Sequence, residues 1–135
     1  MTLLETRQYD SRQHEASCLG EGEREWVPVC PRAELENGWA EAALAGRHQV
    51  ALVALADELY AVSHLDPHTG APVMARGIVG SRKAEGEGHR PTIASPLLKQ
   101  VYDLQTGLCY SDPTLFLECF RTRIVDDVIE VEVPV

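Results

Sequence analysis

The sequence predicts an all-β domain, built as a sandwich or partly open barrel of short antiparallel strands. Residues 128–133 alternate strictly, with Ile129, Val131 and Val133 expected to face a core while the glutamates between them face solvent. Residues 48–55 form an almost unbroken apolar run, which is typical of a strand buried on both faces. Turns rich in Gly, Pro and Asp separate these and the other short apolar segments, as is typical of all-β folds.

The composition is that of one globular domain with an acidic surface. The chain has 135 residues, of which 44% are apolar, enough to form a single core. Its 12 basic and 21 acidic residues give a net charge of −9. Nucleic acids and anionic membranes attract clustered positive charge, so neither is expected as a partner. An acidic surface suits solubility, or docking to a basic patch on another protein.

The cysteines and the first residues indicate a reducing cytoplasm. The four cysteines include no C-x-x-C pair, so we predict free thiols rather than a zinc site. The start of the chain lacks the apolar run of a signal peptide, and no stretch reaches a membrane-spanning length. We therefore expect a cytoplasmic protein.

The chain divides into a tail and one domain. Residues 1–25 carry nine charges and little apolar content after Leu4, so they are expected to be disordered. Residues 26–135 hold the apolar segments and are expected to form a single domain.

The first half of the domain predicts a meander. Residues 26–30 indicate a strand, which Pro28 restricts to a sheet edge or a strand start. A turn or a single helical turn follows, and then three consecutive antiparallel strands: 40–44, 48–55 and 59–63. Because Ala and Leu are strong helix formers, a helix over 40–57 is the alternative. The interruption at Gly46 favours strands.

The second half is expected to be further β-structure after a long connection. Residues 81–91 are polar and glycine-rich, and predict a flexible loop. Gly86 and Gly88 do not make a phosphate loop, because the G-x-x-x-x-G-K pattern is missing. Residues 115–125 continue the β-structure, and Asp126 and Asp127 predict a tight turn before the last strand.

Two segments, 61–72 and 92–107, share one design. Each has a strand-like approach followed by a turn that carries a proline, Pro67 or Pro96. Two such turns at the tips of adjacent hairpins can grip one object between them.

These segments resemble the two ligand loops of the Rieske fold. In that family the loops read Cys-Pro-His-x-Gly-Ala-Pro and Cys-Pro-x-His-Gly, and hold a two-iron cluster with two Cys and two His. Here the corresponding strings are Asp-Pro-His-Thr-Gly-Ala-Pro and Ser-Pro-Leu-Leu-Lys. The four ligand positions are therefore Asp66, His68, Ser95 and Leu98. Three of the four ligand types are replaced, so the resemblance implies a Rieske-like fold without a cluster or other cofactor of its own.

A more specific resemblance is to the small subunit of the bacterial NAD(P)H-dependent assimilatory nitrite reductase. The strings that carry it are Val-Met-Ala-Arg-Gly-Ile-Val-Gly at 73–80 and Ala-Ser-Pro-Leu-Leu-Lys-Gln at 94–100. The resemblance implies a large-subunit partner with sirohaem, a 4Fe–4S cluster and FAD, which reduces nitrite to ammonium with electrons from NAD(P)H. The small chain would then be non-catalytic and would dock to that subunit.

Candidate docking residues follow from this resemblance. Arg76 and Lys99 are positive residues near the altered loops, and Leu97 and Leu98 are neighbouring leucines expected at a loop tip. The alternative for the leucines is that they fill the hollow left by the missing cluster.

Other hypotheses remain beside the docking subunit. One is a stand-alone binding or scaffold module for another oxidoreductase. A second is a mononuclear metal site at Asp66 and His68, against which stands an Asx turn in which the Asp66 side chain accepts backbone amide hydrogens. A third is a hydrolase built on Ser95, His68 and Asp66, which the missing nucleophile-elbow pattern argues against.

Overall fold

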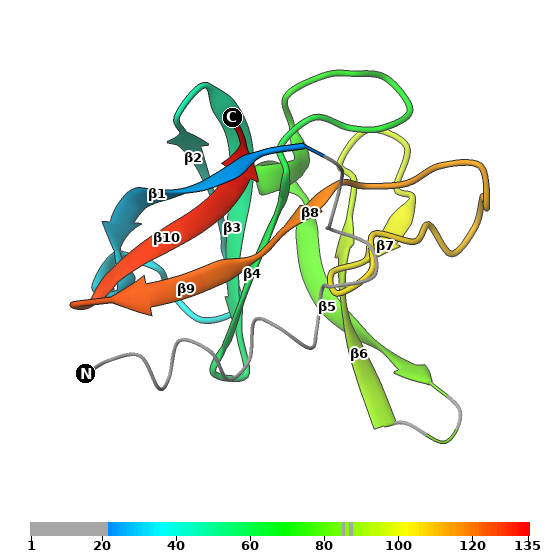
Figure 1. The fold of residues 1–135 in the computed structure, drawn as a ribbon. Coiled ribbons are helices and arrows are strands. Elements are labelled where there is room, and N and C mark those ends of the chain that lie inside the picture. Colours follow the sequence, from blue (N-terminus) through cyan, green and yellow to red (C-terminus); the bar gives the residue numbers. More distant parts are fainter. Residues whose placement is uncertain (1–21, 85, 87) are drawn as a thin grey trace.

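The computed structural model describes residues 22–84, 86 and 88–135, and these fold into β-structure with two short 3₁₀ turns (Figure 1). The elements are β1 (Arg24–Pro31), η1 (Arg32–Glu34), β2 (Ala40–Ala45), β3 (His48–Leu55), β4 (Glu58–Ser63), η2 (Met74–Arg76), β5 (Ile78–Ala84), β6 (Gly88–Ala94), β7 (Val101–Asp103), β8 (Cys119–Phe120), β9 (Thr122–Val125) and β10 (Val128–Pro134). The all-β prediction is confirmed, and the helix alternative over 40–57 is wrong.

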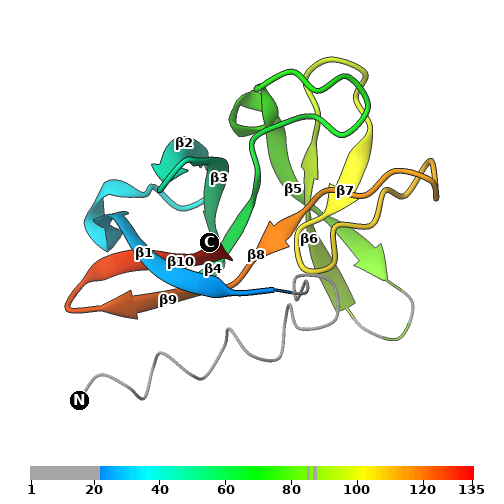
Figure 2. The same cartoon turned by 45° about the horizontal axis from the view of Figure 1, so that its top comes forward.

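Three antiparallel sheets make up this part of the chain. Their strand orders are β1-β10-β9, β2-β3-β4-β8 and β5-β6-β7. Figure 2 shows the first sheet and the third sheet at opposite ends of the molecule, with the four-stranded sheet between them. The architecture is thus a stack of open sheets and not a closed barrel.

The central sheet is buried on both faces, which explains the unbroken apolar run of β3. Val50, Leu52 and Ala54 pack toward β10, in a core with Ile129 and other residues. Ala51, Val53 and their neighbours on β4 pack instead in a second core, with residues of η2, β6 and β7. Since successive side chains of a strand point to opposite faces, both faces of β3 must be apolar.

The last strand is confirmed, but it is not at an edge. Ile129, Val131 and Val133 are buried as expected, and the two aspartates before β10 form its turn with positive φ angles. β10 lies between β1 and β9, so its glutamates do not lie at a free edge of the sheet. They pair across the sheet instead: Arg123 Nη2 lies 2.7 Å from Glu130 Oε1.

The expectation of a flexible connection over 81–91 is wrong. β5 and β6 pair along their whole length, with Arg82 opposite Arg90. The sequence did not indicate this hairpin because its side chains are mostly polar and charged. These side chains contact neighbouring segments: the Arg82 guanidinium stacks 4.1 Å from the centre of the Tyr110 ring. Gly86 and Gly88 adopt positive φ at the turn, which is their role here.

The tail expectation falls mostly outside the described residues, of which the first is Gly22. Arg24 and Glu25 belong to β1, so the domain begins earlier than residue 26. Within the described part of the chain, Cys30, Cys109 and Cys119 form no disulfide bond. No helix in the described part of the chain is long and apolar enough to cross a membrane.

Candidate functional site

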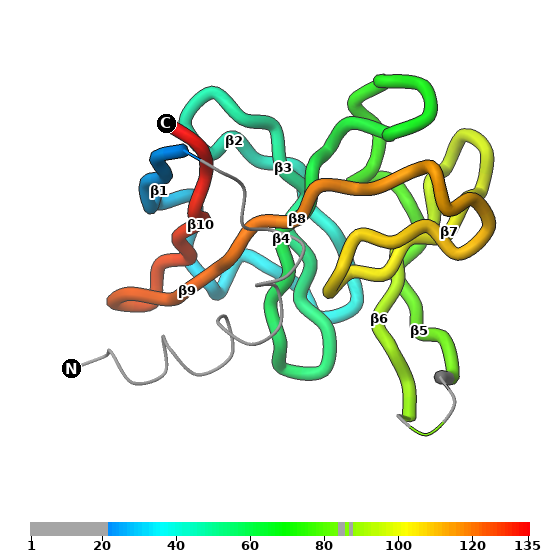
Figure 3. The backbone as a smooth tube through the Cα atoms, turned by 45° about the vertical axis from the view of Figure 1, so that its right-hand side comes forward, coloured from blue at the N-terminus to red at the C-terminus, as the bar shows by residue number. Residues whose placement is uncertain are grey.

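The two proline turns lie at one end of the molecule. The segment between β4 and η2 forms the first tip (65–72), and the segment between β6 and β7 forms the second tip (95–100). Figure 3 shows both at the end that carries the β5-β6-β7 sheet, with the 108–118 segment beside them.

Asp66 shapes the first tip from the inside. Its side chain is buried, and Oδ1 accepts hydrogen bonds from the backbone N–H groups of His68 at 2.7 Å and Thr69 at 3.2 Å. The Gly70 amide donates to the Asp66 carbonyl, and the Asp66 amide to that of Ala71. This is the predicted Asx turn, and it is confirmed.

The same turn occurs a second time after β7. The string Asp-x-x-Thr-Gly is found at 66–70 and again at 103–107. Asp103 Oδ1 accepts from the backbone amides of Gln105 at 2.7 Å and Thr106 at 3.0 Å, and the Gly107 amide donates to the Asp103 carbonyl. In each copy, the threonine hydroxyl accepts from the amide two residues on.

Ser95 closes the second tip. Its amide donates to the Gln100 carbonyl, and its carbonyl accepts from the amide of Lys99, whose φ is 59°. Its hydroxyl oxygen accepts from the Leu97 amide at 3.2 Å. The turn is therefore stabilised by hydrogen bonds from both the backbone and the side chain of one buried serine.

A side-chain hydrogen bond joins the two tips. The Ser95 hydroxyl donates to Asp66 Oδ2, the oxygen that the Asx turn does not use. Burial would raise the pKa of Asp66, but the hydrogen bonds from Ser95, His68 and Thr69 outweigh burial and lower the pKa below its ordinary value. Asp66 is therefore an ionised carboxylate at neutral pH with both oxygens engaged.

Comparison with known proteins agrees with this geometry. The model of the family described as "Rieske-like [2Fe-2S] domain" matches residues 25–132. The chain belongs to this Rieske-like family. The chain is also 31% identical over 108 residues to the nitrite reductase (NADH) small subunit of Salmonella typhimurium, covering 78% of this chain and 95% of that one. Within the family, it belongs with the small subunits of NAD(P)H nitrite reductase.

Solved structures share this fold. A protein from Mycobacterium tuberculosis, assigned as an NADH-dependent nitrite reductase small subunit, has a TM-score of 0.75 at 34% identity, covering 84% of this chain and 98% of that one. The Escherichia coli protein NirD has a TM-score of 0.66 at 29% identity, covering 82% of this chain and 97% of that one. The ferredoxin of carbazole 1,9a-dioxygenase from Nocardioides aromaticivorans has a TM-score of 0.66 at 24% identity, covering 82% and 98%, and shows the fold alone.

The side chains of this Rieske-like domain do not fit a two-iron cluster. Asp66 and Ser95 stand at the positions of the two cysteine ligands. Their side chains offer oxygen atoms in place of sulfur, and these oxygens are joined by a hydrogen bond. At the two histidine positions, the His68 side chain is exposed and Leu98 has no donor atom. Iron–sulfur clusters need thiolate or imidazole ligands, and only one such group is present here. Among the described residues, no group of three or more His, Cys, Asp or Glu side chains is placed to hold a metal ion.

The same contacts argue against a hydrolase. The Ser95 hydroxyl donates to the Asp66 carboxylate, and His68 contributes its backbone amide to that carboxylate. In a triad of Ser95, His68 and Asp66 the serine hydroxyl would have to donate to the imidazole, and here it donates to the carboxylate instead.

The candidate docking residues fall in two places. Leu97, Leu98 and Lys99 are exposed on the second tip. Leu65, which the sequence did not suggest, is exposed on the first tip. Arg76 lies apart on η2, where it lines a hollow of about 410 Å³ with Trp39, Ile78 and their neighbours.

Two residues that support the tips, His64 and Tyr102, were missed. His64 Nδ1 accepts the Ala75 amide at 3.1 Å, and burial, followed by the charge of Arg76, lowers its pKa. Tyr102 is fully buried, and its hydroxyl donates to Gln100 Oε1 at 3.3 Å. Burial, with Cys109 and Asp66 nearby, raises the pKa of Tyr102 to about 12. The sequence signal that could have pointed to Tyr102 is the second Asp-x-x-Thr-Gly string, which directly follows it.

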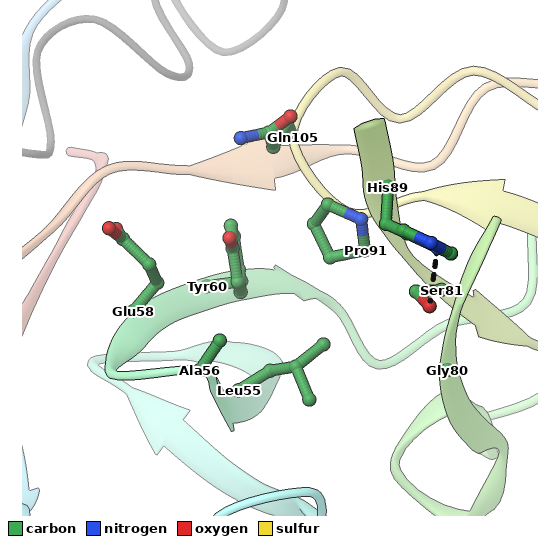
Figure 4. A pocket seen from close by; sticks show the side chains of 9 residues that line it. All are labelled: Leu55, Ala56, Glu58, Tyr60, Gly80, Ser81, His89, Pro91 and Gln105. Carbon is green, nitrogen blue, oxygen red and sulfur yellow. Dashed lines mark hydrogen bonds between the residues drawn. The ribbon is translucent and has the colours of Figure 1, made fainter. Parts of the chain in front are cut away.

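A separate hollow of about 460 Å³ lies between the β3–β4 turn and the β5–β6 hairpin. Figure 4 shows Glu58 and Tyr60 on one wall, and Pro91 and His89 on the other. The Ser81 hydroxyl lies 3.5 Å from His89 Nδ1, and both side chains are exposed. This distance is at the long limit of a hydrogen bond, so the pair is not an activated nucleophile.

Proposed function

We propose that this chain is a non-catalytic small subunit of a cytoplasmic NAD(P)H-dependent nitrite reductase, which reduces nitrite to ammonium. Its partner is a large subunit that carries sirohaem, a 4Fe–4S cluster and FAD. The redox chemistry belongs to these cofactors. The small chain binds no cofactor and acts by contact.

The observation that carries the proposal is the match to two kinds of nitrite reductase chain. Besides the small subunits, the chain is 32% identical over 84 residues to the nitrite reductase [NAD(P)H] large subunit of Klebsiella oxytoca, covering 62% of this chain and 8% of that one. A similar sequence thus occurs within the same polypeptide as a large subunit. A domain that is fused to its partner in one protein is expected to contact the same partner as a separate chain in another. The linker raises the effective concentration of the two surfaces but does not itself supply the contacts between them.

The exposed leucines of the tips support a docking surface there. Leu65, Leu97 and Leu98 are 40%, 46% and 50% exposed. Apolar side chains gathered at loop tips are typical of a protein interface. Lys99 adds a positive charge among them in a chain of net charge −9, which favours a partner surface with carboxylates.

Co-expression tests the proposal directly. The tagged chain is expressed with the large subunit encoded in the same genome, and the purified material is assayed for nitrite-dependent NAD(P)H oxidation. We expect a complex that turns over, and no turnover by the small chain alone. Turnover by the isolated chain would refute the non-catalytic role. Capture of a different flavoprotein in place of this large subunit would support the scaffold hypothesis.

A further inference from the structure

Asp66 and Ser95 each stabilise the turn of their own tip and also make a hydrogen bond to the other tip. Asp66 Oδ1 closes its own tip by accepting two amides, while Oδ2 accepts the hydroxyl hydrogen of Ser95 from the other tip. Ser95 closes its own tip through its backbone and through the bond from the Leu97 amide to its hydroxyl oxygen. The two residues are 1% and 2% exposed, so water does not compete for this contact.

The second Asp-x-x-Thr-Gly turn uses its aspartate in the same way. Asp103 Oδ1 shapes the turn, and Oδ2 accepts from Arg90 on β6 and from the Tyr110 hydroxyl at 2.6 Å. In both copies, one carboxylate oxygen accepts the two amides of the turn and the other accepts from a side chain outside the turn, although in the second copy Arg90 Nη2 also lies 3.2 Å from Asp103 Oδ1. The cross-tip contact of Asp66 is thus built on a turn that this fold also uses to fix the loop after β7.

We propose that Asp66 and Ser95 form a positioning pair, which locks the two tips together and so presents Leu65, Leu97 and Leu98 as one rigid docking surface. In cluster-binding Rieske loops, the shared cluster fixes the distance between the two loop backbones. Here a charge-assisted hydrogen bond between two buried side chains fixes that distance instead. A surface held in its bound conformation loses less entropy on association. The docking part of the inference rests on the proposed function, whereas the locking of the tips does not.

Ser95→Ala removes the cross-tip donor without adding bulk. Ser111→Ala is the matched control, because Ser111 is an exposed serine on the neighbouring 108–118 segment. Asp66→Asn is a second, milder variant, since it keeps an oxygen for the amides of His68 and Thr69 but removes the charge that Ser95 donates to. If the alanine variant fails to fold, the asparagine variant supplies the same comparison.

Hydrogen exchange on the isolated chain tests the locking. Ser95→Ala is expected to speed exchange of the His68 and Thr69 amides at least about tenfold, although they lie on the other tip, and Asp66→Asn is expected to act in the same direction. Ser111→Ala should leave these rates unchanged. Unchanged rates at His68 and Thr69 in Ser95→Ala would overturn the proposal, because a purely local role of Ser95 does not reach the first tip.

In Asp66→Asn the amide to follow is that of Leu97 on the second tip, because His68 and Thr69 bond to the substituted side chain itself. An unchanged rate at Leu97 in that variant would likewise overturn the proposal.

Binding to the purified large subunit from the same genome tests the docking. We expect Ser95→Ala to raise Kd about tenfold while Ser111→Ala leaves it unchanged, and the double variant Asp66→Asn with Ser95→Ala to lose little more than the stronger single variant. Equal Kd values for the wild type and Ser95→Ala would overturn the positioning role. If the wild type itself does not bind, the proposed function fails, and the exchange rates still decide whether the tips are locked.

Discussion

Gly70 and Gly107 occupy the same place in two copies of one turn, but their surroundings differ completely. Their φ angles are 81° and 84°. A Cβ atom at Gly107 would lie 2.1 Å from the carbonyl oxygen of Leu117, while at Gly70 it would meet nothing within 4 Å. The first turn therefore has free space beside Gly70, whereas the second turn packs at Gly107 directly against the backbone of the 108–118 segment.

Alanine at the two glycines separates backbone strain from steric clash. Gly70→Ala is expected to cost about 1–2 kcal/mol, because only the left-handed conformation is penalised. Gly107→Ala is expected to cost about 2–5 kcal/mol, since overpacking against a backbone carbonyl adds to the same strain. Urea unfolding of both variants measures the difference. Equal losses would show that the turn after β7 yields as easily as the exposed one.

The ion pair of Arg90 and Asp103 is expected to stabilise the fold far more than the surface pairs. Asp103 is buried, Arg90 Nε lies 2.5 Å from its Oδ2, and Nη2 lies 3.2 Å from its Oδ1. Arg90→Met leaves a buried carboxylate without its cation, so we expect a loss of about 3 kcal/mol.

Arg123→Met is the matched control for that pair. Arg123 pairs with Glu130 on the more exposed β9–β10 surface and stacks on Trp26, so its removal is expected to cost about 1 kcal/mol or less. Chemical denaturation gives both values. A loss for Arg123→Met equal to that for Arg90→Met would contradict the ranking.

Stability is expected to fall on the acid side. Burial opposes ionisation of Asp66 and Asp103, but their hydrogen bonds dominate and lower both pKa values in the folded state. An unfolded aspartate titrates at about 3.9, so the stabilisation is fully present above that pH and is lost as the pH falls through the lower folded values. Urea midpoints measured across this range should drop, and Asp66→Asn should make the drop shallower. A variant with the same acid profile as the wild type would show that Asp66 does not contribute.

The tips are expected to be the contact surface for the large subunit. Leu98→Asp places a charge in an apolar contact, and Lys99→Glu reverses the one positive charge of the second tip, so each should weaken binding at least about tenfold. Val135→Asp is the control, because Val135 is an exposed apolar residue that follows β10, and Figure 3 shows this C-terminus on the side of the molecule opposite the tips. Co-purification and titration with the large subunit measure the effect. Unchanged binding by both tip variants would place the interface elsewhere, and the Arg76 hollow would be tested next.

Much of the fold could be predicted because local patterns and global burial agree. The alternation of β10 and the unbroken apolar run of β3 each correspond to the faces that the sheets bury. The β5–β6 hairpin was missed because its polar side chains gave no alternation, and their partners, such as Tyr110 for Arg82, come from distant segments.

The candidate site shows the same division between local and distant contacts. The Asx turn of Asp66 could be predicted, because its amide partners lie two and three residues away. The bond between Asp66 and Ser95 could not, because it joins residues 29 positions apart and depends on how two hairpins lie together. The sequence shows that both residues stand at cysteine positions of the Rieske loops, but only the structure shows the hydrogen bond between their side chains.

The visible absorption spectrum of the isolated chain, purified without oxygen and analysed for iron and sulfide, tests the central claim most directly. We predict a colourless protein without stoichiometric iron, because Asp66 and Ser95 are hydrogen-bonded to each other and supply no thiolate. A brown preparation with two irons per chain and the spectrum of a two-iron cluster would contradict it.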